Sequence, residues 1–287
     1  MNKKHASYKR KRQITNFFVY LVLISISLVW LIPFVYLVLQ SFRGEQFAYV
    51  NYIIPKNFTL DNYIFILTNK EQYNFMRWYF NTLIIAIATA IIQTIIVLMV
   101  SYVFSRLRFK LRQAYMKLIL ILGMFPGFMT MIAIYEILKL IHLNTNIFSL
   151  IIVYCASSAM SYYISKGFFD TIPFALDEAA KIDGATQNKI FFKIILPLAK
   201  PIIIYTLLVA FIAPWGDYMF AKYLAGADPT MYNVAIGLKE FLGREIIDQY
   251  FTRFCAGAVF TSIPIVILFF LLQRFYVEGV TGGSVKG

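Results

Sequence analysis

The sequence contains little charge, few cysteines and few histidines. Asp, Glu, Lys and Arg make up only 14% of its 287 residues, whereas a water-soluble domain carries about 25%. Cys155 and Cys255 both fall in apolar runs and give no disulfide framework. His5 and His142 lie too far apart along the chain to indicate a metal site. The shortage of charge instead indicates that much of the chain lies in a lipid bilayer.

The sequence also lacks a nucleotide-binding loop. No G-x-x-x-x-G-K-[ST] motif occurs, and the glycine-containing end at 281–287 does not fit it. That motif holds phosphates with backbone N–H groups and a lysine. We therefore expect no ATP site of this kind, no cofactor and no catalytic residue on this chain. A function driven by ATP would need an ATPase on a separate chain.

Apolar residues form long runs. They make up 60% of the chain, whose mean hydropathy is +0.69. A helix needs about 20 mostly apolar residues to cross the hydrocarbon core, and the runs do not alternate as the strands of a membrane barrel do. The first run is longer than the apolar core of a signal peptide, about 7–15 residues, so we expect a retained helix. The fold class predicted is therefore an all-α polytopic membrane protein with six transmembrane helices, near residues 17–39, 78–104, 116–135, 146–165, 201–221 and 254–273.

Basic residues are distributed unevenly along the chain, whose formal net charge is +13. Most of them fall in segments that six spans would place on one side of the membrane. Because Lys and Arg are enriched in cytoplasmic loops, we expect both termini in the cytoplasm. The basic tail 1–16 would then orient the first helix, with binding of a specific partner as the alternative. Nucleic acid is not an expected partner.

The cytoplasmic segment 168–200 is predicted to form a helix, a turn and a second helix. Pro173 suits the first turn of a helix, and Gly184 suits its end because glycine adopts the left-handed conformation at low cost. Thr186 can cap the second helix. The first helix would expose small alanines beside a carboxylate, a shape that fits a cleft on a partner. A solvated amphipathic loop without a partner is the alternative.

This segment resembles the EAA loop of permeases from binding-protein-dependent ABC importers. The family pattern is Glu-Ala-Ala, a short spacer, Gly, nine residues, Ile, one residue and Leu-Pro. Glu178–Ala180, Gly184, Ile194 and Leu196–Pro197 supply it with no departure in spacing. The ending from Glu278 resembles that of the carbohydrate-importer branch. The resemblance extends over nearly the whole chain and points to the second permease subunit of the maltose/maltodextrin type.

The resemblance implies a transport subunit in the cytoplasmic membrane of a bacterium. It would pair with a second homologous permease to form the path for a sugar, here an oligosaccharide of the maltodextrin type. A cytoplasmic ABC ATPase dimer would bind ATP and magnesium, and an extracytoplasmic sugar-binding protein would deliver the cargo. The helix-turn-helix would be the coupling loop that docks on the ATPase, through Glu178, Ala179, Ala180, Asp183, Gly184, Leu196 and Pro197.

The same resemblance gives the chain one transmembrane domain, residues 17–275, between the tails 1–16 and 276–287. In the C-terminal tail, Gly282, Gly283 and Lys286 are candidates for contact with the ATPase dimer. A flexible terminus is the alternative, because glycine-rich segments behave as flexible coils.

Three residues after the fifth run are candidates for the substrate path or a gate. Trp215-Gly216-Asp217-Tyr218 is similar to a Trp-Asn-Asp/Glu-Phe stretch of the carbohydrate branch. A carboxylate at membrane depth is usually functional, although Asp217 at the water interface would cost little. Trp215 and Tyr218 could stack on a sugar ring or belong to the aromatic belt of the membrane interface.

Several spans contain proline, which removes a backbone donor and kinks a helix. Ordinary bundle packing is one explanation, because neighbouring helices satisfy the freed carbonyls. The other is that kinks open a cavity or let helices move. Gly123, Pro126 and Gly127 lie close together, which favours the third span for such a role; the other prolines within spans are Pro33, Pro214 and Pro264.

Two other functions compete with the ABC permease. A secondary transporter driven by an ion gradient would need ionisable groups inside the bundle, and the middle of each run lacks them. A membrane scaffold or receptor would have no transport activity. Uptake that requires both ATP and a partner ATPase separates the three functions.

Overall fold

The computed structural model describes residues 2–71, 73–144 and 146–282, and in this part of the chain the regular structure is helical. An isolated antiparallel bridge between Arg43 and Phe58 is the only strand-like pairing among these residues. The all-α prediction is therefore confirmed. The chain forms two compact units, one made of residues up to Thr68 together with Phe241–Phe260 and the other of Asn69–Glu240 together with residues from Thr261 onward.

The first unit contains α1 (Asn2–Ser41), α2 (Asp61–Thr68) and the beginning of α14 (Ile247–Gly282). Its polar core is organised by Arg43, whose side chain is fully buried. Arg43 Nε donates to the carbonyl of Glu45 at 3.1 Å, and Nη2 donates to the carbonyl of Phe47. These bonds fix the segment that follows α1.

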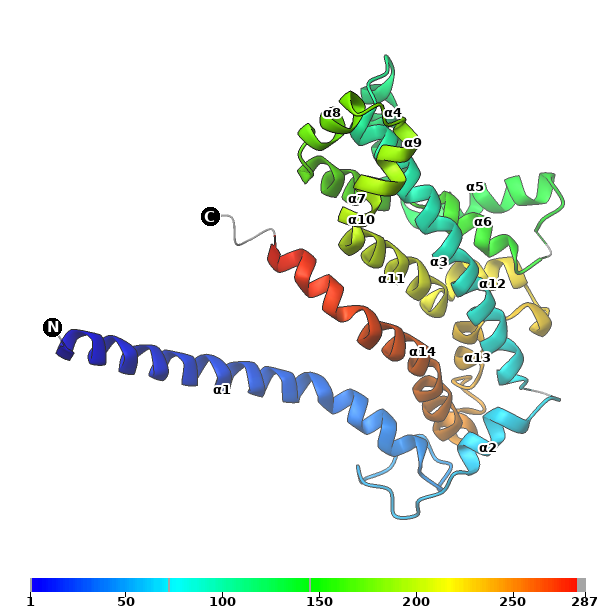
Figure 1. Ribbon diagram of the computed structural model, residues 1–287. Helices are drawn as coiled ribbons and strands as arrows, with labels where there is room; N and C mark the ends of the chain where they lie inside the picture. Colours follow the sequence, from blue (N-terminus) through cyan, green and yellow to red (C-terminus); the bar gives the residue numbers. More distant parts are fainter. Residues whose placement is uncertain (1, 72, 145, 283–287) are drawn as a thin grey trace. The chain divides into compact units, whose positions relative to one another are not determined.

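In the second unit, α3 (Phe75–Arg106) packs against α11 (Lys200–Gly216) and α7 (Ala159–Thr171). Asn74 caps its first turn by accepting from the Arg77 amide at 3.1 Å. Figure 1 shows α8 and α9 at one end of α3 and α13 toward the other. Besides the part of α14 from Thr261 onward, this unit contains α4 (Arg112–Gly123), α5 (Gly127–Leu140), α6 (Ser149–Ala156), α8 (Ala175–Ile182), α9 (Gln187–Ile190), η1 (Phe191–Ile195), α10 (Leu196–Leu198), α12 (Met219–Ala225), η2 (Pro229–Met231) and α13 (Val234–Glu240).

Among the described residues, three helices are long and apolar enough to cross a membrane: Arg12–Ser41, Phe75–Arg106 and Ile247–Gln273. They contain the spans predicted at 17–39, 78–104 and 254–273. A fourth candidate is a bent pair, Gln187–Leu198 with Lys200–Gly216, whose two helices meet at 81°. Its second helix covers most of the predicted run 201–221, but α11 ends at Gly216 because Asp217 has an extended backbone (ψ 99°).

The spans predicted at 116–135 and 146–165 are not continuous helices, and the prediction of one helix in each was wrong. The first breaks between α4 and α5, where Pro126 has an extended backbone (ψ 129°) and no N–H to continue the helix. The second breaks between α6 and α7, where Ser158 Oγ donates to the Cys155 carbonyl at 2.7 Å. Crossing of the bilayer by these interrupted pairs stays a prediction.

Proline alone does not determine where the helices break. The break at Pro126 agrees with a kink in the third predicted span, whereas its role in opening a cavity or letting helices move stays a prediction. Pro33, Pro214 and Pro264 instead lie inside α1, α11 and α14. Gly123 brings α4 close to α7, since a Cβ there would be 3.0 Å from the Cβ of Ala159.

Candidate functional site

The segment predicted as the coupling loop forms two helices joined by a turn. The first helix, α8, ends before Gly184, whose positive φ of 75° is the left-handed conformation expected of a helix-ending glycine. Thr186 caps α9 by accepting from the Lys189 amide at 3.4 Å. The second helix continues through a π-helical turn, η1, into α10.

The inner side of this helix-turn-helix packs on α3 and α7. Tyr102 of α3 lies 4.6 Å from the ring of Phe191 and 6.3 Å from that of Phe169. Its hydroxyl pairs with Gln187 Oε1 at 3.1 Å. The two helices are therefore held against the bundle by a continuous apolar cluster: Leu98, Tyr102, Phe169, Ile172, Ala180, Ile190, Phe191, Ile195, Ala199 and Ile202.

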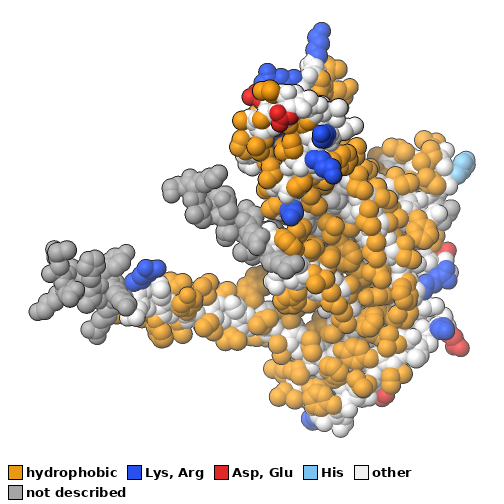
Figure 2. Space-filling view, viewed as in Figure 1, with side chains coloured by type: hydrophobic (Ala, Val, Ile, Leu, Met, Phe, Trp, Pro, Cys, Tyr) orange, Lys and Arg blue, Asp and Glu red, His pale blue; other side chains and the backbone are white. Residues whose placement is uncertain are grey.

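The outer side of α8 is open. Ala175, Glu178, Ala179 and Asp183 are exposed, and Ile182 is 86% exposed. The exposed face of α8 therefore combines two alanines, two carboxylates and one large apolar side chain. Figure 2 shows charged side chains gathered at the end that carries α8 and α9, next to a broad hydrophobic surface.

Not every predicted coupling residue lies on that open face. Ala180 is 7% exposed and belongs to the inner cluster. Leu196 is half-buried, whereas Gly184 and Pro197 are exposed. The predicted set thus combines outward-facing residues with one that holds α8 to the bundle.

Arg106 is a residue at this site that the sequence analysis did not identify. Its guanidinium lies 3.2 Å from a carboxylate oxygen of Asp177, and both side chains are almost fully buried. Arg106 Nη2 also donates to the carbonyls of Phe169 at 2.8 Å and Ile172 at 2.7 Å. The group stacks on the ring of Phe174 at 4.3 Å. The end of α3 is thereby fixed to the end of α7 and to the start of α8.

A cavity of about 650 Å³ lies where three helical interruptions meet. The breaks are those between α4 and α5, between α6 and α7, and between α11 and α12. Asp217 lies at the cavity wall, where Tyr154 donates to one carboxylate oxygen at 2.6 Å and the Phe220 amide donates to the other at 3.0 Å. The wall is formed by Leu122, Gly123, Phe125, Gly127, Thr130, Met131, Ile134, Val153, Tyr154, Ala156, Ser157, Ala159, Asp217, Met219 and Phe220.

The three predicted path residues do not act as one group. Asp217 lines the cavity, but Trp215 is 5% exposed and packs against the ring of Tyr79 at 5.5 Å. Tyr218 is half-buried and is absent from the cavity wall. Tyr154, which the sequence analysis did not select, is the cavity residue whose side chain binds the Asp217 carboxylate.

Comparison with known proteins gives the context for these features. Residues 98–281 match the family described as "Binding-protein-dependent transport system inner membrane component". The chain belongs to this family.

Several relatives of this inner membrane component match over nearly its whole length. The galactooligosaccharides transport system permease protein GanQ of Bacillus subtilis is 34% identical, over 98% of this chain and 99% of its own. The maltodextrin transport system permease protein MalD of Streptococcus pneumoniae is also 34% identical, with the same coverage. The maltose/maltodextrin transport system permease protein MalG of Vibrio vulnificus is 32% identical, over 89% and 90%.

A solved structure confirms the fold of the inner membrane component. That solved structure is of a bacterial ABC transporter involved in the import of the acidic polysaccharide alginate. Its chain matches this one with a TM-score of 0.77 and 22% identity, over 93% of this chain and 98% of its own. A structure of the bacterial alginate ABC transporter in complex with an alginate pentasaccharide-bound periplasmic protein matches with a TM-score of 0.56 and 16% identity, over 92% and 95%.

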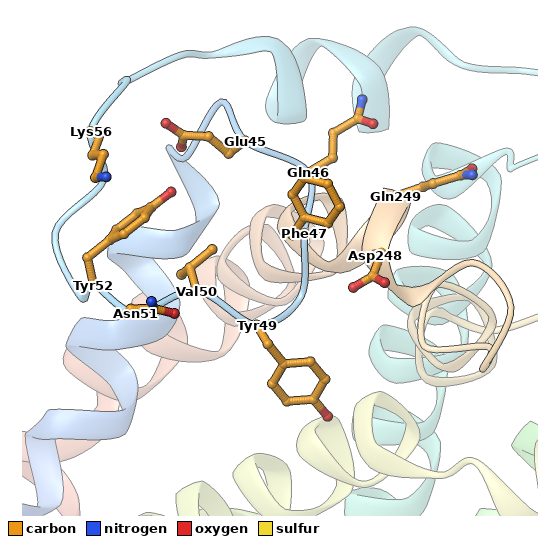
Figure 3. Close-up of a pocket in the computed structure, with 10 residues that line it drawn as sticks. All are labelled: Glu45, Gln46, Phe47, Tyr49, Val50, Asn51, Tyr52, Lys56, Asp248 and Gln249. Atoms are coloured by element: carbon orange, nitrogen blue, oxygen red, sulfur yellow. The ribbon is translucent and has the colours of Figure 1, made fainter.

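The first unit of the inner membrane component has a cavity of its own, of about 740 Å³. Figure 3 shows Glu45, Tyr52 and Lys56 along one side and Asp248 of α14 on the other. The Lys56 ammonium lies 4.9 Å from the Tyr52 ring, and Asn57 donates to Glu45 at 3.0 Å. The wall is rich in aromatic rings, amides and carboxylates, and its remaining members are Gln46, Phe47, Tyr49, Val50, Asn51 and Gln249.

The predicted tail contact falls mostly beyond the part that the structure describes. Gly282 is the last residue of α14. Gly283 and Lys286 lie outside the described residues. Their contact with an ATPase stays a prediction.

Proposed function

We propose that this chain is a permease subunit of an ATP-driven sugar importer and forms the translocation path with a second, homologous permease. The observation that carries the proposal is the open face of α8, where Glu178 and Ala179 are exposed within the region that matches the family. The named cargoes of its relatives are galactooligosaccharides and maltodextrins. The proposed cargo is therefore a neutral oligosaccharide, of the maltodextrin type as first expected.

In this proposal α8 inserts into a cleft of a cytoplasmic ABC ATPase dimer. Ala175 and Ala179 leave room for the walls of the cleft, and Glu178 supplies the charge that a basic side chain of the partner would bind. Gly184 follows the end of α8, Pro197 lies exposed within α10, and Asp183 extends the exposed face. ATP and magnesium are held by the partner. Closure of the dimer moves α8, and the bundle follows.

The cavity at the three helical interruptions is the proposed part of this subunit's path for the sugar. Oligosaccharides present hydroxyl groups, which a carboxylate can accept and a phenol can accept or donate. Asp217 and Tyr154 provide these groups on an otherwise apolar wall. Trp215 lies outside the cavity wall, where it packs against Tyr79.

The remaining partners and the orientation follow the same proposal. Both termini and α8 lie in the cytoplasm, and the segment that follows α1 lies outside, where an extracytoplasmic sugar-binding protein docks. The polar and aromatic cavity beside Tyr52 would belong to that outer face. The tail at Gly282, Gly283 and Lys286 contacts the ATPase dimer. The whole assembly lies in the cytoplasmic membrane of a bacterium.

Reconstitution tests this function directly. The chain is assembled with its partner permease, ATPase and binding protein in proteoliposomes, and uptake of labelled maltodextrins and galactooligosaccharides is measured. The proposal predicts uptake of one of these sugars only when ATP is present on the ATPase side. Uptake driven by an ion gradient without ATP would support a secondary transporter instead, and no uptake in either condition would support a membrane scaffold.

A further inference from the structure

Helix α3 differs from most of its neighbours in the second unit because it is not interrupted. It runs from Phe75 to Arg106 without a glycine or a proline. Other helices of the second unit break at Pro126, at Ser158 and after Gly216. Because α3 is long, continuous and packed on both α7 and α11, it can move as a rigid body.

The inner end of α3 is joined to α8 through buried polar contacts. Arg106 pairs with Asp177 of α8, donates to two carbonyls at the end of α7 and stacks on Phe174. Beside it, Ser105 Oγ donates to Asp170 of α7 at 2.6 Å. A buried arginine deprived of its partner is costly, so separating α8 from α3 is strongly unfavourable.

Arginine is suited to the contacts that join α3 to α8 and α7, which we call the inner joint, in a way that lysine is not. Its planar guanidinium presents several N–H donors in a fixed geometry, so one group can bind a carboxylate and two carbonyls together. A lysine ammonium is a compact point charge at the end of a flexible chain. At position 106 it would keep the charge but lose part of this geometry.

The outer end of α3 is joined just as closely to the segment 229–240. Trp78 Nε1 donates to the Pro229 carbonyl at 3.1 Å. Asn81 donates to the carbonyls of Thr230 at 3.1 Å and Tyr232 at 2.9 Å. Just before this segment, Asp228 accepts a hydrogen bond from the Thr230 amide at 2.9 Å. Hydrogen bonds from the side chain and backbone of Thr230 lower the pKa of Asp228 from its ordinary value.

Two further contacts make the outer joint tight. The Val234 amide donates to Thr82 Oγ1 at 2.8 Å in a buried position. Gly237 of α13 lies directly against Trp78, since a Cβ at that position would be 1.9 Å from the indole ring. The segment 229–240 therefore follows any displacement of α3.

We propose that α3 transmits motion between α8 and the segment 229–240, and that Arg106 is the positioning residue that engages α3 with α8. The proposal rests on the proposed function, because the motion begins where an ATPase binds α8. It adds a route by which ATP binding and hydrolysis on the partner ATPase change the position of the segment 229–240, at the other end of α3 from α8. Coupling between two sites is reciprocal, so binding of a partner at 229–240 would also change the position of α8.

The first test is Arg106→Gln in the reconstituted complex, with Arg108→Gln as the matched control because Arg108 is exposed. Co-purification with the ATPase establishes assembly. If the complex with Arg106→Gln does not assemble, Arg106→Lys is used instead. For the Arg106 variant that assembles, we expect basal ATP hydrolysis within about twofold of the unmodified complex. Its stimulation by sugar-loaded binding protein, and sugar uptake, should fall at least about tenfold, the size of a typical coupling effect. The control Arg108→Gln should keep both the stimulation of ATP hydrolysis and the sugar uptake of the unmodified complex.

Asp177→Asn and the double variant complete a mutant cycle. If the two side chains act as one joint, the double variant loses no more stimulation than either single variant, whereas independent roles would add. Unchanged stimulation and uptake in Arg106→Gln, with the unmodified complex active, would overturn the transmission proposal alone. No ATP-dependent uptake by the unmodified complex would overturn the proposed function itself.

A distance measurement tests whether α3 and α8 move together. Spin labels are placed at Ile182 of α8 and Met99 of α3, both exposed, after Cys155 and Cys255 are replaced by alanine. A second pair, Ile182 with Ile137 of α5, reports movement relative to an element outside the joint. On adding ATP we expect the first distance to change by less than about 2 Å and the second by more, as for helix shifts in switching proteins. Equal changes in both, or no change in either, would overturn the proposal.

Discussion

Asp177 and Glu178 are adjacent in the sequence but have opposite environments. Asp177 is 4% exposed and faces Arg106, whereas Glu178 is exposed on the outer side of α8. A helix turns 100° per residue, so neighbours can face the bundle and the solvent in turn. One carboxylate therefore holds α8 in place and the other remains available to a partner.

Glu178→Lys should impair transport because it reverses the charge offered to the ATPase. Loss of a buried charge pair at an interface costs about 2–5 kcal/mol, so retention of the ATPase during purification and sugar uptake should each fall at least about tenfold. Glu71→Lys makes the same change at an exposed position of the predicted outer loop and should have little effect. Unchanged uptake and unchanged co-purification would remove the docking role of Glu178.

Tyr154→Phe removes one hydroxyl from the cavity and leaves Asp217 without its phenol donor. A hydrogen bond to a charged group contributes about 1.5–3 kcal/mol, so we expect sugar uptake to fall at least about tenfold. Assembly and basal ATP hydrolysis should persist. Tyr223→Phe, a half-exposed tyrosine outside the cavity wall, is the control. Uptake at the unmodified level would place the sugar path elsewhere.

At the scale of single elements, the contact between α13 and α3 is the tightest glycine contact described. Gly237→Ala would force a Cβ into the Trp78 ring, and overpacking of this kind costs about 1–3 kcal/mol. The midpoint of thermal unfolding of the purified complex should fall by at least about 2 °C. Gly216→Ala, where a Cβ meets nothing within 4 Å, should leave it nearly unchanged. Equal midpoints for the two variants would show that the outer joint tolerates rearrangement.

The long helices were predictable from the sequence, whereas the interruptions were only partly so. Runs of apolar residues without charge identified α1, α3 and α14. The same signal covers 146–165, which breaks at Ser157–Ser158 with no proline to mark it. There a serine hydroxyl replaces the missing backbone donor, and hydropathy does not register that exchange.

The candidate site was predictable where it depends on local spacing and not where it depends on long-range contacts. Glu178, Gly184 and Thr186 were found because helix ends and the family motif are local patterns. From the sequence, Arg106 is one of many basic residues that indicate a cytoplasmic position and has no signal of its own. Its partner Asp177 is far away in the sequence, and only the packing of α3 against α8 brings them together.

At the scale of the whole molecule, one orientation must accommodate every partner. In the proposed function, the helix-turn-helix faces the ATPase and the segment after α1 faces the binding protein. Charged side chains at the end that carries α8 agree with a cytoplasmic position under the positive-inside rule. All of the proposed coupling depends on α8 lying against the ATPase in the assembled transporter.

Site-specific photo-cross-linking measures that contact directly. A photoreactive residue is placed at Ile182, which is 86% exposed on α8, and in a separate chain at Tyr49, which is 87% exposed in the predicted outer loop. After illumination of the assembled complex in membranes, the account predicts an adduct of Ile182 with the ATPase subunit and none of Tyr49 with that subunit. An adduct of Ile182 with the sugar-binding protein, or no adduct with the ATPase, would contradict the account.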